Sequence, residues 1–294
     1  MKKLFFTFLT IFTVCSFFAC QHKEQQQTEN HILGLTKQQK KEQKTTFAIE
    51  TVKDSVSKKV GKIVCTSTIS IDFPTKGNPY LLNSIREWII DWTYANDTIP
   101  IDDYHAIMKD YNATSMKEMA DMAQEREADG INIPDEIEMG YAQEMEIKKI
   151  YENDLFVTYC VTTYGYLGGA HGSATGWGTT FRKSDGKVLD HIFRNDKITD
   201  VQQMITQELQ KDFNVNSWEE LKEQLFVDEY ASYVPMPQGD PYIVNDSIVF
   251  SYQQYEIGSY AIGMPGAKIA INDLRKMLAP SFLKILKPNS TKNK

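Results

Sequence analysis

The chain has 294 residues, of which 41% are hydrophobic, 12% aromatic and 24% charged. This hydrophobic share excludes a chain that is disordered or fibrous throughout, and four Cys are too few for a small disulfide-framed protein. With 32 Lys and Arg against 39 Asp and Glu, the net charge of −7 argues against nucleic acid as a partner, because phosphate binding needs a dense basic face. The length allows one or two domains.

The first 20 residues have the pattern of a bacterial export signal. Two Lys follow Met1, residues 4–18 are uncharged and mostly apolar, and Ala19 and Cys20 come next. The apolar run is shorter than the ~20 residues that span a bilayer. A small residue directly before a Cys at this point resembles a lipobox, which implies cleavage before Cys20 and acylation of its thiol, for example with palmitate. A plain secretory signal and an uncleaved anchor are the alternatives.

This pattern predicts where the protein is located. We expect residues 1–19 to be a lipoprotein signal peptide, and Cys20 to anchor the protein to a membrane of the cell envelope, facing the periplasm or the cell surface. Removing residues 1–19 leaves 30 basic and 39 acidic side chains, a net charge of −9. Residues 20–46 are rich in Gln and Lys and have almost no apolar periodicity, which predicts a flexible tether.

Two cysteines would remain in the fold after this processing, Cys65 and Cys160. Each lies in a run of residues that is typical of a strand. In an oxidising compartment they could form a disulfide if their Cα atoms came within ~7 Å. Otherwise, they are buried free thiols that behave as small hydrophobic side chains.

The first part of the fold is expected at residues 47–163. Alternation of apolar and polar residues predicts strands there, apolar residues at helical spacing predict helices, and Ser115 has the form of a helix cap. In chain order the elements are strands at 47–53 and 59–71, a loop at 74–79, helices at 80–94, 102–111 and from 115 to about 130, and strands at 137–151 and 155–164 joined by a turn.

The second part is expected at residues 164–288. Turn dipeptides at 185–186 and 245–246 predict two hairpins. The elements are strands at 176–181 and 187–193, a helix at 197–213, a short helix capped by Ser217, strands at 242–244, 247–255 and 267–271, and a helix that opens at Asp273 and that Pro280 either interrupts or restarts. Because strands and helices come in runs, the fold class is α+β, with mainly antiparallel sheets, helices packed on them, and two consecutive units.

The most unusual segment is residues 164–173, in which four glycines fall within eight residues after a strand. Glycine allows a ligand, or a neighbouring strand at a sharp corner, to approach the backbone closely. The spacing is not that of a dinucleotide-binding loop, and His171 stands where a serine-hydrolase elbow requires glycine. A histidine in such a segment is either a hydrogen-bonded structural residue or a base.

Two segments carry a resemblance to a known family. Residues 164–172 with Phe181, and residues 249–266, resemble the signatures of a domain of unknown function in bacterial envelope proteins, and residues 45–163 resemble the domain that usually precedes it. The pair is found in RsiV-like anti-sigma factors that sense lysozyme, and beside the catalytic domain of PdaC-like peptidoglycan deacetylases. The resemblance implies candidate binding residues in the two segments: Tyr164, Tyr166, Gly168, Gly169, His171, Tyr255, Glu256 and Tyr260.

Only part of the family's activity is expected here. No internal apolar span, sigma-binding segment or deacetylase domain is evident, so we do not expect sigma-factor regulation or deacetylation. The resemblance implies instead a non-catalytic binding module for a wall-associated ligand, such as peptidoglycan fragments, or for a lysozyme-like protein. A net charge of −9 would attract a cationic protein at low salt.

Other chemistry has little support in the sequence. Neither His105, His171 nor His191 forms a zinc-binding pair, and no calcium loop is present, so no metal or other cofactor is expected. The alternative function is a carboxylate-dependent enzyme that acts on peptidoglycan or another envelope glycan, with His171 and Glu256 as participants. A third is a structural envelope component. The sequence assigns no catalytic residue and no oligomeric state.

Overall fold

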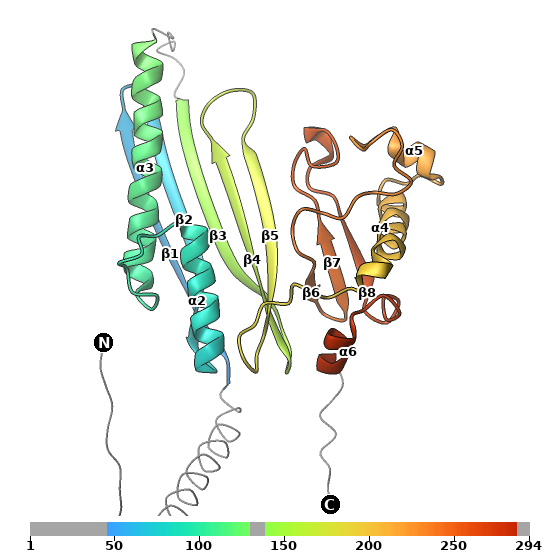
Figure 1. Ribbon diagram of the computed structural model, residues 1–294. Helices are drawn as coiled ribbons and strands as arrows, with labels where there is room; N and C mark the ends of the chain where they lie inside the picture. The colour runs from blue at the N-terminus through green and yellow to red at the C-terminus, as the bar shows by residue number, and fades with distance from the viewer. Residues whose placement is uncertain (1–45, 130–138, 287–294) are drawn as a thin grey trace, which may run out of the picture. The chain divides into compact units, whose positions relative to one another are not determined.

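The computed structural model describes residues 46–129 and 139–286 (Figure 1). The signal peptide, Cys20 and nearly all of the expected tether lie outside these described residues. A five-stranded sheet and a three-stranded sheet, each with helices, make up the described part of the chain. The expected α+β class with mainly antiparallel sheets is confirmed.

The larger sheet takes its five strands in chain order. Neighbouring strands are antiparallel except for the second and third, which run parallel. Parallel neighbours need a long crossover, and here the crossover consists of two helices. The strands are β1 (Ala48–Val60), β2 (Ile63–Lys76), β3 (Met139–Glu152), β4 (Phe156–Tyr166) and β5 (Ser173–Arg182).

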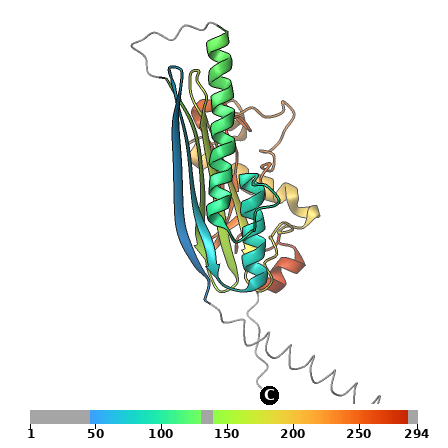
Figure 2. The same cartoon turned by 90° about the vertical axis from the view of Figure 1, so that its left-hand side faces the viewer.

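The crossover helices α2 (Pro79–Thr93) and α3 (Tyr104–Ala128) cover one face of this sheet (Figure 2). The side chain of Asn78 caps α2 by accepting a hydrogen bond from the backbone N–H of Tyr80, and Pro79 begins the helix, where no N–H donor is needed. Leu81, Ile85 and Ile89 recur at helical spacing and are buried against the sheet. Hydrophobic burial on this face therefore holds the helices in place.

The prediction of two helices at 102–111 and from Ser115 is wrong, because α3 is one continuous helix. The actual cap is Asp103, whose Oδ1 accepts from Ala106 N at 3.0 Å. Asn112 remains inside the helix because the polar groups of its side chain form hydrogen bonds beneath α3. Its Oδ1 accepts from Ser67 Oγ at 2.7 Å, and its Nδ2 donates to Asp54 at 2.9 Å.

The first two strands are longer than predicted and form one hairpin. They turn at residues 61–62, where Gly61 has a φ of 55°, and β2 continues through Pro74, the expected start of a loop. Most residues of β1 are exposed because it lies at the edge of the sheet, so alternation with the core does not reveal its second half.

The three-stranded sheet belongs to a second core. Its strands are β6 (Tyr242–Val244), β7 (Ser247–Ser251) and β8 (Gly266–Ala270), all antiparallel. The apolar side of α4 (Ile198–Asp212) packs in this core, and α5 (Trp218–Lys222) follows with Ser217 as its cap, as predicted. The core also receives Phe156 from β4 of the larger sheet.

Several elements of the second part differ from the prediction, and one of them is β7, which ends at Ser251 and not at residue 255. Residues 187–193 form isolated bridges, Phe181 with Val188 and Phe193 with Leu278, in place of a strand. The last helix, α6 (Pro280–Leu286), begins at Pro280 and not at Asp273. Proline is well suited to the first turn of a helix, since its missing N–H would have no partner there.

Hydrogen bonds from side chains join the two sheets. Ile243 in β6 donates its N–H to Thr180 Oγ1 at 2.8 Å, and its carbonyl accepts from Thr158 Oγ1 at 2.7 Å. Both threonines are buried. β4 and β5 are paired, so the larger sheet contains residues on both sides of residue 164, where the sequence predicts that the second unit begins.

Of the two possibilities that the sequence left open for Cys65 and Cys160, the structure has free thiols and no disulfide. They lie on β2 and β4, with β3 between them, which separates them by ~10 Å across the sheet. Cys65 is level with Tyr141 of β3 and Cys160 with Lys148, a further ~23 Å along the strand. Their Cα atoms therefore lie far beyond the reach of a disulfide.

Candidate binding site

The face of the larger sheet that points away from α2 and α3 is polar. Along β2, Ile69 and Ile71 are buried under the helices, while the alternate residues Thr68 and Ser70 are only partly buried on the other face. Side chains alternate between the faces of a sheet, so the register assigns the residues of every strand to one face. On the face away from the helices, Phe156, Thr158 and Thr180 of β4 and β5 are buried against the three-stranded sheet and its core. The part of this face that is not covered forms a second surface. We call this second surface the open face.

Two rows of side chains cross the open face. Strand pairing aligns each residue with one on the next strand, and both rows run from β1 to β5. The first row, in strand order, is Lys53, Ser70, Glu146, Thr162 and Gly176. The second row is Ser55, Thr68, Glu144, Tyr164 and Ala174.

All residues of these rows except Ser55 and Gly176 line a groove with a volume of about 310 Å³. Met264, from the loop before β8, lies over Gly176, where a Cβ would stand 3.8 Å from its sulfur. Hydroxyls, two carboxylates, one ammonium, a tyrosine and a methionine therefore surround one space. We call it the open-face groove, lined by Lys53, Thr68, Ser70, Glu144, Glu146, Thr162, Tyr164, Ala174 and Met264 among its residues.

The two signature segments meet beside this groove. The ring of His171 stacks on that of Tyr260, with centroids 3.8 Å apart and planes at 20°, and the ring centroids of Tyr255 and Tyr260 are 6.0 Å apart. Tyr255 Oη lies 3.3 Å from His171 Nε2. His171, Tyr255 and Tyr260, the aromatic cluster, thus unite candidate residues that are far apart in the sequence.

The hydrogen bonds of His171 indicate which ring nitrogen carries the proton when the side chain is neutral. Nδ1 lies 2.9 Å from the carbonyl oxygen of Gly172, which can only accept, so the proton is on Nδ1. Nε2 is then an acceptor for the Tyr255 hydroxyl. His171 is therefore held by its neighbours, as a structural histidine is, while its ring stays exposed.

Tyr255 has an unfavourable backbone conformation. It is the third residue of a turn at 253–256, with a φ of 65°, where Gly or Asn is usual. Its side chain is 53% exposed, so burial does not explain why a large residue occupies this position. Strain of this kind occurs often at binding sites.

The remaining residues of that turn attach it to the larger sheet. Gln253 binds both polar backbone groups of Gly176, accepting from its N–H at 2.9 Å and donating to its carbonyl at 2.7 Å. Gln254 accepts from Ala174 N at 2.8 Å. The two amide side chains thus form hydrogen bonds with backbone groups of β5, as a neighbouring strand would.

Glu256 holds the turn at residues 253–256 in place through two hydrogen bonds. Its Oε1 accepts from Gln238 N and its Oε2 from Gln253 N, both at 2.7 Å. Because both carboxylate oxygens hold backbone N–H groups, this side chain positions the turn on which Tyr255 stands.

The glycine-rich segment lies at the same end of the sheet. Gly168 and Gly169 have φ of 87° and 105°, and Tyr166 donates its hydroxyl to the carbonyl of Gly169 at 3.0 Å. A Cβ on Gly172 would stand 2.4 Å from the hydroxyl oxygen of Tyr164, so only glycine allows that ring to lie there. Tyr164 therefore connects the open-face groove with the aromatic cluster.

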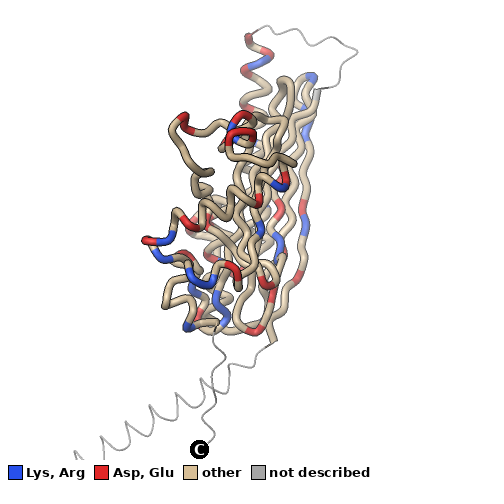
Figure 3. Tube along the Cα trace, turned by 90° about the vertical axis from the view of Figure 1, so that its right-hand side faces the viewer, with Lys and Arg blue, Asp and Glu red and all other residues tan. Residues whose placement is uncertain are grey.

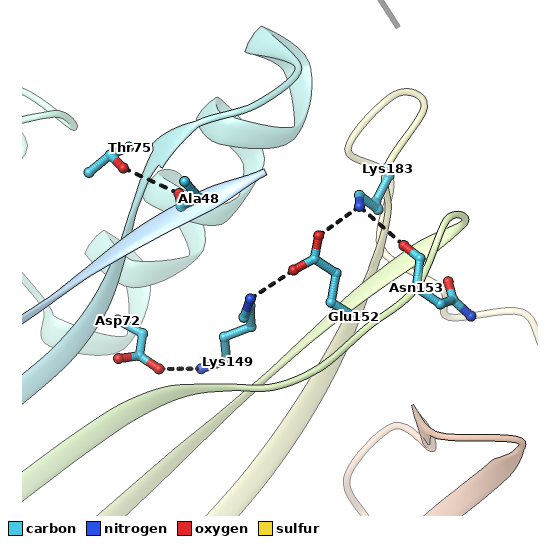
Figure 4. Close-up of polar contacts among 7 residues, drawn as sticks. All are labelled: Ala48, Asp72, Thr75, Lys149, Glu152, Asn153 and Lys183. Carbon is cyan, nitrogen blue, oxygen red and sulfur yellow. Dashed lines mark hydrogen bonds and ion pairs between the residues drawn. The ribbon is translucent and has the colours of Figure 1, made fainter. Parts of the chain in front are cut away.

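A separate ionic network lies where β3 and β4 turn (Figure 4). Glu152 binds Lys149 at 2.7 Å and Lys183 at 2.8 Å, and Asp72 accepts from the backbone N–H of Lys149 at 3.0 Å. Partial burial raises the pKa of Glu152, but the hydrogen bonds from the two lysines outweigh it, so that its pKa lies below the usual value. The two ion pairs of Glu152 connect β3 with the segment after β5, and each charged side chain of this network already has a partner in the protein.

Acidic residues gather on α5 and the segment after it (Figure 3), and exposed aromatic residues lie in the same segment. Phe226 is 63% exposed and Tyr230 is 87% exposed. The backbone N–H of Phe226 donates to Ile257 O at 2.7 Å, which places this segment beside the loop of the aromatic cluster. The acidic residues here are Glu219, Glu220, Glu223, Asp228 and Glu229, and we call the whole the acidic patch.

Residues 46–129 and 139–286 contain no group of three or more His, Cys, Asp or Glu side chains placed to hold a metal ion. No helix within these ranges has both the length and the hydropathy of a membrane span.

The sequence did not identify the strand residues that line the groove. Lys53, Ser70 and Glu144 were assigned only to alternating strands, because their grouping depends on strand register. The run Thr66, Thr68 and Ser70 was the available signal, since hydroxyl residues repeat at every second position of β2.

Comparison with known proteins supports the fold. Residues 190–272 match a family model described as "Protein of unknown function (DUF3298)". This match includes the signature at 249–266 and lies after the glycine-rich segment. A search of curated proteins found no match.

Two solved structures are similar to this chain. A member of the DUF3298 family from Bacteroides fragilis has 21% sequence identity and a TM-score of 0.66, and the match covers 83% of this chain and 99% of that one. A DUF3298 family protein from Pseudomonas aeruginosa has 14% identity and a TM-score of 0.53, covering 81% of this chain and 96% of that one. The two-sheet fold is thus shared with DUF3298 proteins.

Proposed function

We propose that this protein is a lipid-anchored binding module of the bacterial cell envelope, and that the open-face groove holds a wall-associated glycan or glycopeptide. The observation that carries the proposal is the meeting of the two signature segments in the aromatic cluster, at the end of the open-face groove. The candidates His171, Tyr255 and Tyr260 form the cluster, and the candidate Tyr164 lines the groove.

The lining of the groove fits such a ligand. Sugars present hydroxyls that both donate and accept, and Thr68, Ser70 and Thr162 offer the same capacity while Glu144 and Glu146 accept. Exposed tyrosines add a rigid apolar surface with a polar tip. A small number of polar groups beside apolar ones is the usual composition of a ligand site.

The location of the protein in the cell envelope is part of the proposal. The lipobox at Cys20 supports membrane attachment, and the resemblance to RsiV-like and PdaC-associated domains supports an envelope location. A Cys20→Ser variant is expected in the soluble exported fraction, whereas the unchanged protein is expected in the membrane fraction with an acyl mass. An unchanged protein that still carried Met1 and no acyl group would contradict lipidation.

A cationic, lysozyme-like protein is a second candidate ligand, and the acidic patch favours it. Exposed Phe226 and Tyr230 stand among five carboxylates. Charge complementarity accelerates association with a basic partner, and exposed aromatic residues supply contact area. Binding at the acidic patch would be weakened by salt and by Phe226→Ala, and not by changes in the groove.

The alternative of a carboxylate-dependent glycosidase rests on Glu144 and Glu146, which share the open face with their Cα atoms ~7 Å apart. Glu146, however, pairs with Lys148 at 2.5 Å, and Glu256 is occupied by two backbone N–H groups. Incubation with peptidoglycan separates the two functions. We expect no released fragments, and a clean product that disappears in Glu144→Gln would establish catalysis.

Calorimetric titration of the purified full chain with soluble muropeptides tests the proposed function. Tyr255→Gly should abolish most of the binding while removing the backbone strain. Tyr94→Gly is the matched control, because Tyr94 also has a positive φ, 51°, and is 86% exposed, but lies at the end of α2 on the other face. Equal loss of binding in both variants, or no binding by the unchanged chain, would contradict the proposal.

A further inference from the structure

Strand register determines where the charged residues lie in the open-face groove. Lys53 is on β1, in the row that contains Ser70, and Glu144 is on β3, in the row that contains Thr68. Strand β2 lies between them, so the two hydroxyls separate the ammonium from the carboxylate. Two strand spacings place the charged residues ~10 Å apart across the sheet, measured between strand axes.

These two charges are unpaired in the structure. Neither Lys53 nor Glu144 forms an ion pair with a described residue, and they do not pair with each other. Both side chains are exposed and line the same groove. A bound group between them could therefore reach both charges.

The other carboxylate of the groove is already neutralised. Glu146 Oε1 lies 2.5 Å from Lys148 Nζ, and Lys148 follows on the same side of β3. Lys53 and Lys148 balance Glu144 and Glu146, so the floor has no net charge. A ligand with a single charge would be attracted by one of the unpaired groups and repelled by the other, whereas a ligand with both charges is attracted by both.

We propose that the open-face groove recognises a zwitterionic end group, with an ammonium on Glu144, a carboxylate on Lys53, and the hydroxyls of Thr68 and Ser70 beneath it. The inference rests on the proposed function and deepens it. In a wall fragment such an end group is a terminal diamino acid of the peptide stem whose second amine is free, so the charged residues of the groove recognise the peptide part of a glycopeptide.

The test compares four probes on the purified full chain by calorimetry. They are a disaccharide–tripeptide that ends in a diamino acid with a free amine and a free carboxylate, the same fragment with its amine acetylated, the same fragment with that carboxylate amidated, and the disaccharide without peptide. Because hydrogen bonds to charged groups are stronger than neutral ones, each blocked fragment should bind about 10-fold more weakly than the intact one. The free diamino acid, as a fifth probe, should compete with the intact fragment.

Charge variants assign each contact. Glu144→Gln should remove the preference for the free amine over the acetylated one, and Lys53→Gln the preference for the free carboxylate over the amide. Lys58→Gln and Glu87→Gln are matched controls, exposed residues on the helix-covered side, and should keep both preferences.

The outcomes separate the inference from the proposed function. Equal affinity for the intact, acetylated and amidated fragments would overturn the zwitterion inference and leave a glycopeptide-binding function standing. No binding of any wall fragment would overturn the proposed function, and this inference with it. Loss of binding in Lys58→Gln as large as in Lys53→Gln would also overturn the assignment to the groove.

Discussion

The two faces of the five-stranded sheet use the same strands for different purposes. On the covered face, Ile69 and Ile71 of β2 are completely buried under α2 and α3. On the open face, their neighbours Thr68 and Ser70 line the groove. The comparison teaches that stability and recognition can be separated at adjacent positions of one strand, because alternate side chains share a backbone but no surroundings.

The largest expected effect comes from removing a buried side chain on the covered face. Ile69→Ala should destabilise the fold by about 2–5 kcal/mol, since it removes apolar contacts and leaves a cavity. The adjacent change Thr68→Ala, which removes an exposed hydroxyl contact to Ser55, should cost less than about 1 kcal/mol. Chemical denaturation of both variants measures the difference, and equal losses would break the distinction between the faces.

A smaller effect is expected from the buried polar contact under α3. Asn112→Ala leaves the Ser67 hydroxyl, which is completely buried, without its partner. An unsatisfied buried hydroxyl costs about 1–3 kcal/mol. The double variant Ser67→Ala with Asn112→Ala should recover part of this loss in the same denaturation experiment, and failure to recover any would show that the pair is not coupled.

At the aromatic cluster we expect binding to change more than stability. Tyr255→Gly relieves a positive φ but removes the ring contacts, so the free energy of unfolding should stay within about 1 kcal/mol of its original value. A thermal melt measures this. A loss as large as that of Ile69→Ala would make Tyr255 part of the structural core.

The ionic network at the turn between β3 and β4 predicts a small pH dependence. The pKa of Glu152 is lower in the folded chain than its usual 4.5, so its ion pairs contribute stability above that value. This contribution is lost as the pH falls through the folded pKa. Since the pairs are partly exposed, Glu152→Gln should lower stability at pH 7 by less than about 1 kcal/mol and should flatten the acid side of the profile. A profile with the same slope in both proteins would contradict the role of Glu152.

No effect is expected from a reducing agent. Cys65 and Cys160 are free and lie on strands separated by β3. The melting temperature should therefore be equal with and without reductant, and a clear decrease in reductant would indicate a disulfide.

The covered face could largely be predicted from the sequence, because burial leaves a periodic pattern. The spacing of Leu81, Ile85 and Ile89 predicted α2 to within a residue or two. The pattern failed at Ser115, where a residue typical of helix caps is buried inside α3. Polar side chains satisfied by tertiary contacts, such as Asn112 with Ser67, do not reveal themselves in local sequence.

The candidate site could be predicted only in part. The signature segments contain all three residues of the aromatic cluster, but the contact between His171 and Tyr255 joins residues 84 apart and depends on how the two sheets meet. The groove required still more information, since Lys53, Thr68 and Glu144 come together only through the pairing of three strands. The parallel pairing of β2 and β3, which the two crossover helices make possible, sets which of these residues lie side by side.

Chemical-shift mapping by NMR, with labelled full chain and a soluble muropeptide, tests most directly whether the open face is the recognition surface. We expect the largest shifts on residues 66–70, 142–146 and 162–166 and on the side chains of His171 and Tyr255, and no shifts on α2 and α3. Shifts concentrated on α2, α3 or the acidic patch, with the groove unchanged, would contradict this expectation.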